Sequence, residues 1–163
     1  MIRNCMVLAL ASLFLFSCKH SAYMRKTYVD LKKSVNEAEV SILNDTVKVV
    51  FGNNVLFDFG SARIKAEVFP AFKRFSDALN KHPETEILVC GYTDTVGGEG
   101  TNINLSQKRA DSAKAMLVYN NVDDRRIFTW GLGFKNPVAS NTTEEGRQQN
   151  RRVEFVILHN YKN

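Results

Sequence analysis

The chain of 163 residues is long enough for one domain and short appendages. Hydrophobic residues make up 44% of it and charged residues 24%, which excludes a disordered chain and a collagen-like fibre. The formal net charge is +5, but Lys and Arg are interleaved with acids and form no long run, so nucleic acid is not expected as a partner.

Residues 1–17 are typical of a signal peptide. One positive charge precedes an uncharged run over residues 6–16, which is shorter than the roughly 20 residues that a membrane-spanning helix needs. Leu15 and Ser17 then stand at positions −3 and −1 before Cys18, a pattern that resembles the lipobox of bacterial lipoproteins. Phe16 departs from the small or β-branched residue that is usual at −2. An ordinary secretory signal followed by an incidental cysteine is the alternative.

The lipobox resemblance implies that Cys18 becomes the acylated first residue of the mature protein, carrying palmitate or a similar chain. Such a protein is anchored to a membrane and does not span it. Residue 19 is Lys and not Asp, which by resemblance to lipoprotein sorting indicates the outer membrane, with the domain in the periplasm.

Residues 18–45 are expected to form a tether behind this anchor. Apolar residues recur within it at spacings of three and four, which is a helical stripe: Tyr28, Leu31, Val35, Ala38 and Ile42. The stripe predicts a short helix lying on the domain, or a frayed tether that could reach about 80 Å when fully extended. Because this segment carries none of the binding signature described below, we expect it to contribute little to ligand affinity.

Residues 46–160 are expected to form one α+β domain. Strand-like stretches cover 47–51, continuing as 55–59 after an interruption, then 86–92, 126–131 and 152–158. Helical patterns lie between them, at about 68–81 with Pro70 near the start, at 102–119, and as a short helix within 141–150. Strands that alternate with helices predict a two-layer α/β sandwich.

Charged residues gather after the strand at 86–92. Asp94 lies at the carboxyl end of this strand, where α/β folds place ligand sites. Asn102 and Arg109 lie along one face of the next helix, seven residues apart. The acid and the base could form a structural ion pair, or they could bind the ammonium and the carboxylate of one zwitterion. Spacing alone leaves both open.

The sequence from Thr93 to Ala110 resembles the signature of the OmpA-like peptidoglycan-binding family, T-D-x-x-G followed by N-x-x-L-S-x-x-R-A. The similarity continues at 57–59, at 131–137 and at 146–154, and therefore covers nearly all of residues 47–158. Lys108, where many members carry Arg, is one small departure. The resemblance implies a mixed four-stranded sheet with helices packed on one face.

The resemblance also implies a ligand, the diamino acid of the wall peptide, usually meso-diaminopimelate. Asp94 would take its amino group and Arg109 its carboxylate, with Asn102 supporting the pocket. Five further residues are implied around the site: Thr93 and Thr95 beside the acid, and Phe57, Asp58 and Leu105 along the lining. For residues 150–152, a salt-bridging turn and a ligand contact both stay open.

The expected function is that of an outer-membrane lipoprotein that binds peptidoglycan non-covalently, links the outer membrane to the wall and supports envelope integrity. No enzymatic activity, cofactor or metal is expected, because the histidines are isolated and no nucleophile motif is present. A domain whose main role is to bind other envelope proteins remains the alternative.

Overall fold

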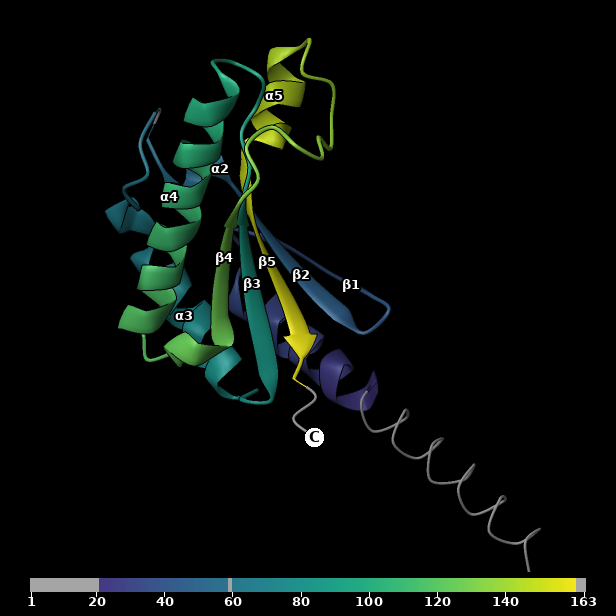
Figure 1. Ribbon diagram of the computed structural model, residues 1–163. Coiled ribbons are helices and arrows are strands. Elements are labelled where there is room, and N and C mark those ends of the chain that lie inside the picture. Colours follow the sequence, from purple (N-terminus) through teal and green to yellow (C-terminus); the bar gives the residue numbers. More distant parts are fainter. Residues whose placement is uncertain (1–20, 59, 161–163) are drawn as a thin grey trace, which may run out of the picture.

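The computed structural model describes residues 21–58 and 60–160. The predicted signal peptide and the predicted acylation site at Cys18 lie outside these residues. The described chain forms a five-stranded sheet with the order β1-β2-β5-β3-β4, packed against helices (Figure 1). The strands are β1 Glu39–Leu43, β2 Thr46–Gly52, β3 Thr85–Gly91, β4 Ile127–Gly131 and β5 Arg152–His159. The helices are α2 Asn53–Leu56, α3 Phe69–Asn80, α4 Glu99–Tyr119 and α5 Glu144–Asn150, and residues 21–34 are helical as well.

The sheet is mixed. Strands β1, β2, β5 and β3 pair antiparallel in that order, and β4 pairs parallel with β3. A parallel pair needs a crossover connection, and the long helix α4 provides it. No helix in the described part of the chain is long and apolar enough to cross a membrane.

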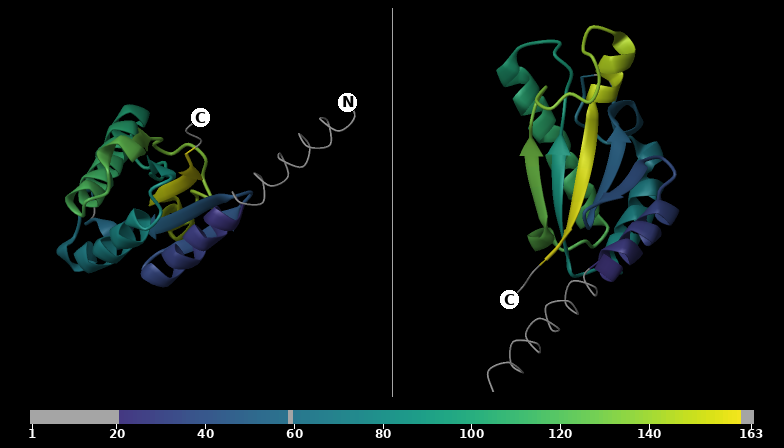
Figure 2. Two further views of the ribbon diagram at one scale, coloured as in Figure 1. Left: turned by 90° about the horizontal axis from the view of Figure 1, so that it is seen from below. Right: turned by 90° about the vertical axis from the view of Figure 1, so that its right-hand side faces the viewer.

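One face of the sheet carries the core. Side chains alternate along β2, so that Val47, Val49 and Phe51 are buried while their neighbours are only partly covered. Phe51 contacts Phe72 and Phe75 of α3, with ring centroids 5.7 and 6.0 Å away. The helical segment 21–34, α3 and α4 all lie on this side of the sheet (Figure 2, left). The predicted α+β fold with helices on one face is therefore confirmed.

The sheet has five strands where four were predicted, because residues 39–43 form the edge strand β1. Asn44 and Asp45 take positive φ angles of 47° and 60°, which makes the two-residue turn that folds β1 back onto β2. Reading the apolar stripe through to Ile42 as one helix was therefore wrong. Its last part follows the alternation of a strand, in which Val40 and Ile42 are both half-buried on the core side.

The described part of the expected tether lies against the domain. Met24, Leu31 and Val35 are 0, 0 and 2% exposed and belong to the same core cluster as the sheet. The hydroxyl oxygen of Tyr23 accepts a hydrogen bond from the Glu84 backbone N–H at 3.1 Å, next to the start of β3. Residues 21–45 thus contribute core side chains as well as an edge strand.

The predicted continuation of the first strand at residues 55–59 does not form a strand in its described part, residues 55–58. Residues 53–56 form a single helical turn, in which the Phe57 N–H donates to the Asn53 carbonyl at 2.8 Å. Phe57 then makes only an isolated bridge with Ile64. The turn brings the side chains of Asn53 and Phe57 toward the carboxyl end of β3, where the candidate site lies.

Candidate functional site

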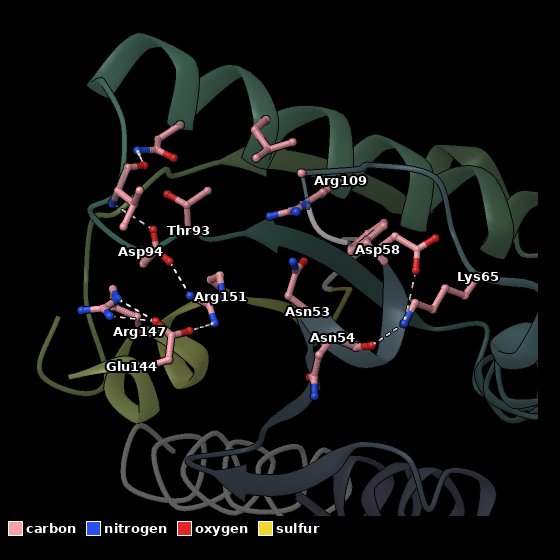
Figure 3. A pocket seen from close by; sticks show the side chains of 15 residues that line it. Asn53, Asn54, Asp58, Lys65, Thr93, Asp94, Arg109, Glu144, Arg147 and Arg151 are labelled. Atoms are coloured by element: carbon pink, nitrogen blue, oxygen red, sulfur yellow. Dashed lines mark hydrogen bonds and ion pairs between the residues drawn. The ribbon is translucent and has the colours of Figure 1, made fainter. Parts of the chain in front are cut away.

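A pocket of about 510 Å³ opens at the carboxyl end of β3, between α2, the first half of α4 and α5 (Figure 3). Its lining combines residues from four separate stretches of the chain: Asn53, Asn54, Phe57, Asp58, Gly60, Lys65, Thr93, Asp94, Val96, Asn102, Leu105, Arg109, Glu144, Arg147 and Arg151.

Two glycines let α4 approach the strand ends closely. A Cβ added at Gly91 would lie 2.1 Å from the Ser106 carbonyl oxygen, and one at Gly131 would lie 2.5 Å from the Gln107 nitrogen. A hydrogen bond also joins α4 to the loop after β4, because the Ser106 hydroxyl accepts from the Gly133 N–H at 2.9 Å. The first half of α4 is therefore fixed beside the loop that carries Asp94.

Asp94 is a buried carboxylate that already has two partners. Only 7% of the residue is exposed. Its Oδ1 accepts from the Val96 N–H at 2.9 Å, and its Oδ2 accepts from Nη1 of Arg151 at 2.6 Å. Arg151 also donates to Glu144 at 2.6 Å. Burial alone would lower the pKa of Arg151, but the hydrogen bonds to Asp94 and Glu144 raise it above its ordinary value.

Arg109 is a buried guanidinium that faces no carboxylate at ion-pair distance. It is 3% exposed, and its Nε donates to the Ser61 carbonyl at 2.9 Å. Its two terminal nitrogens lie 3.0 and 3.1 Å from the side-chain oxygen of Asn53, once the Asn53 amide is oriented with that oxygen toward them. The guanidinium carbon lies 5.3 Å from the centre of the Phe57 ring. No ion pair joins Arg109 to any of the described acids.

The environment of Arg109 disfavours its charge. Burial, followed by the nearby Arg151, lowers its pKa to about 10, and Asp94 offsets this in part. The group nevertheless stays protonated near neutral pH. Neutral acceptors and an aromatic ring contact this buried guanidinium, but no carboxylate neutralises its positive charge. The carboxylate of a ligand could do so.

The other predicted site residues fall into three groups. Thr93, Asn102 and Leu105 line the pocket. The Thr93 hydroxyl is buried and has no hydrogen-bond partner, whereas the Asn102 amide donates to the Val96 carbonyl at 3.0 Å and so braces the Asp94 loop. Thr95 is exposed and lies outside the lining.

Phe57 and Asp58 form the opposite wall. Asp58 is 81% exposed at its side chain and lies 3.6 Å from the ammonium of Lys65, which also donates to the Asn54 carbonyl at 2.9 Å. Figure 3 shows this pair on the side of the pocket away from Asp94. The pocket thus brings together the predicted acid and base and five of the six other predicted site residues, and Thr95 is the exception.

Residues 150–152 behave as a salt-bridging turn. Arg152 bonds to Glu154 at 2.8 Å, and its guanidinium carbon lies 3.8 Å from the centre of the Tyr92 ring. The Asn150 side chain bonds to the backbone of the 138–139 loop. Arg151 alone of the three reaches the pocket.

Sequence reasoning missed Asn53, Glu144 and Arg147 in the lining. Arg147 bonds to Glu144 at 3.0 Å and continues the chain of charges that ends on Asp94. The motif at 146–154 marked this region, but not which of its charged side chains turn inward. Asn53 gave no signal, because its place in the pocket depends on the helical turn at 53–56.

The pocket thus presents an anionic end at Asp94 and a cationic end at Arg109. A ligand with an ammonium and a carboxylate on one short frame would match both ends. The described residues hold no group of His, Cys, Asp and Glu that could bind a metal ion.

Comparison with known proteins gives the family. The OmpA family profile matches residues 56–151. The chain is 40% identical over 137 residues to the probable lipoprotein YiaD of Escherichia coli, covering 83% of this chain and 63% of YiaD. It is 39% identical over 115 residues to the peptidoglycan-binding protein ArfA of Mycobacterium tuberculosis, covering 71% of this chain and 35% of ArfA. The chain therefore matches less than two thirds of the length of these curated relatives.

Solved structures show the same fold. A MotB-like protein of Desulfovibrio vulgaris has a TM-score of 0.79 at 22% identity, covering 88% of this chain and 99% of that one. The peptidoglycan-associated lipoprotein of Burkholderia pseudomallei has a TM-score of 0.59 at 33% identity, covering 63% of this chain and 87% of the other. The family profile spans more than half of the sequence, from the α2 turn through both ends of the pocket, and the chain belongs to the OmpA family.

Proposed function

We propose that this protein binds the peptide of peptidoglycan non-covalently, through a diamino acid such as meso-diaminopimelate held in the pocket. The ligand's ammonium pairs with Asp94, and a carboxylate of the same residue pairs with Arg109. The observation that carries this proposal is the state of Arg109, a guanidinium that is 3% exposed, lines the pocket and has no acidic partner.

The neighbouring charges fit this ligand. Arg151 forms ion pairs with both Asp94 and Glu144. A ligand ammonium can therefore pair with the Asp94 carboxylate while Arg151 keeps its ion pair with Glu144. The Thr93 hydroxyl, which is buried without a partner, is available to the ligand. Three relatives support binding to the wall by their names: ArfA is named a peptidoglycan-binding protein, the Burkholderia protein a peptidoglycan-associated lipoprotein, and a Pseudomonas aeruginosa structure at 31% identity a cell wall anchor.

The proposal extends to a lipid anchor at Cys18 and a place on the outer membrane, facing the periplasm. It rests on the lipobox-like sequence before Cys18 and on relatives named as a lipoprotein and as an outer membrane protein. The protein would then join the outer membrane to the wall and support envelope integrity, with no chemical step of its own. Other envelope proteins stay open as further partners.

A pull-down on purified sacculi tests the proposal. The chain from residue 18 onward, with Cys18→Ser to remove the acyl chain, should sediment with sacculi. A soluble wall peptide that carries meso-diaminopimelate should displace it. The matched control is the same peptide with lysine in that position, which keeps the ammonium but lacks the second carboxylate. Equal displacement by both peptides, or no sedimentation, would count against the proposed ligand, and the second result would favour a protein adaptor.

A further inference from the structure

The helical segment at residues 21–34 has one face in the core and cations on the opposite face. Met24, Thr27 and Leu31 are fully buried. At about 100° per residue, the exposed residues fall within an arc of roughly 120° on the other side. This basic face consists of Arg25, Lys26, Lys32 and Lys33, with the 39% exposed Val29 among them.

The basic face is not an ordinary mixed-charge surface. Asp30 is the one acid within residues 21–34, and its carboxylate is occupied by the buried His82 at 2.9 Å. Arg25, Lys26 and Lys33 form no ion pair with any described residue, and Lys32 donates to the Tyr28 hydroxyl at 2.9 Å. On α3, by comparison, Lys73 and Arg74 pair with Asp77 and Glu37. The N-terminal cations are therefore left for an anionic partner.

The chain length before this segment places it near the proposed anchor. Cys18 precedes Ser21 by three residues, which span about 10 Å at most when extended. An acyl chain on Cys18 would hold the start of the helical segment within about 10 Å of the membrane surface, a distance comparable to the roughly 8 Å over which charges act at physiological salt. The long reach expected of a flexible tether does not apply, because residues 21–34 are packed on the domain.

The pocket lies at the other end of the domain. Tyr23 contacts His82 and His159, at the amino end of β3 and the carboxyl end of β5. Asp94 follows the opposite end of β3, and the seven residues of that strand separate the two ends by roughly 20 Å. Figure 1 shows α5 and the loop before α4 at one end of the sheet and the 21–34 helix at the other.

We propose that the basic face docks on the anionic phospholipid headgroups of the membrane that holds the anchor, and so turns the pocket away from that membrane. Each Lys or Arg near an anionic surface increases partitioning by about fivefold. Val29 and the ring of Tyr28 sit among the cations, as apolar side chains do in helices that lie on a membrane. The orientation rests on the proposed anchor and ligand, whereas binding of the basic face to lipid does not.

Vesicle sedimentation tests the lipid contact without the acyl chain. The chain from residue 18 onward with Cys18→Ser should bind vesicles that contain phosphatidylglycerol, bind phosphatidylcholine vesicles far less, and lose the difference at high salt. The variant R25Q/K26Q/K33Q should reduce partitioning roughly a hundredfold. The matched control, R63Q/K108Q/K135Q, removes the same charge from exposed positions elsewhere and should keep most of the binding.

The same variants on sacculi separate this inference from the proposed function. R25Q/K26Q/K33Q should bind sacculi as the parent does, since its three substitutions lie outside the pocket. Equal vesicle binding by the two triple variants would overturn the inference, as would absence of any preference for phosphatidylglycerol. Loss of sacculus binding in R25Q/K26Q/K33Q would instead mean that the basic face binds the wall, which also overturns it.

Discussion

Asp94 and Arg109 line one pocket from the end of β3 and the middle of α4, yet they do not pair with each other. Asp94 bonds to Arg151 at 2.6 Å, and Arg109 is held by the Ser61 carbonyl, the Asn53 amide and the Phe57 ring. The simple structural ion pair that the spacing allowed is therefore absent between these two residues. Their separate partners leave each able to take one charge of a ligand.

The shape of the Arg109 guanidinium should matter as much as its charge. In Arg109→Lys, one ammonium would have to replace a planar group that contacts Ser61 on one edge and Asn53 on the other. We expect binding to the wall peptide to fall at least tenfold while thermal stability changes little. Calorimetric titration and a thermal melt measure the two. Affinity that equals that of the parent would show that only charge is required.

The close contact between β3 and α4 gives a prediction about the scaffold. Gly91→Ala places a Cβ against the Ser106 backbone, which cannot move aside without shifting α4. We expect a loss of about 1–3 kcal/mol in stability, together with weaker sacculus binding. Gly100→Ala is the control, because it has open space and lies within α4, where Ala favours the helix. If Gly91→Ala melts and binds like the parent, the packing of α4 does not set the site.

The sequence predicted the site better than it predicted the edge of the sheet. Asp94 and Arg109 could be placed together because Asp94 follows a buried strand and Arg109 lies two turns into the helix predicted at 102–119. Strand β1 could not be found, because Leu31, Val35 and Ile42 keep helical spacing across the actual helix end. Residues 39–43 form a strand because the turn at Asn44 and Asp45 folds them back to pair with β2.

The sequence located the segments that form the site, but it did not predict which of their side chains contact one another in the pocket. Thr95 is adjacent to the buried Asp94 in the sequence, but its own side chain is exposed. Arg151 and Glu144 come from a distant segment, and their approach to Asp94 depends on how α5 sits over the end of the sheet. The sequence motif located that segment but could not give its partners.

The N-terminal helical segment should be needed for folding. Leu31 is fully buried in the core, so Leu31→Ala should lower the free energy of unfolding by about 2–5 kcal/mol. Val29→Ala, at an exposed position on the same segment, should cost far less. Denaturant unfolding followed by circular dichroism compares them. Equal stability of the two variants would mean that residues 21–34 act as a tether that the domain does not require.

Anchoring can be tested in cells. If Cys18 is the acylated residue, Cys18→Ala should leave a larger precursor and incorporate no fatty-acid label. Growth with a clickable fatty acid, followed by gel analysis, reads both. Cys90 is buried on β3 and Cys5 lies in the predicted signal peptide, so neither is expected to carry the label. Label that persists in Cys18→Ala would exclude the site.

Titration of a soluble wall peptide containing meso-diaminopimelate into the parent, Asp94→Ala, Arg109→Ala and the double variant tests the central claim most directly. Removing either partner of a buried charge pair costs about 2–5 kcal/mol, so each single variant should bind at least about thirtyfold more weakly. The double variant should be hardly worse than either one. Thermal melts of all four proteins report whether a loss reflects folding. Single variants that fold normally and bind the peptide with the affinity of the parent would contradict the account.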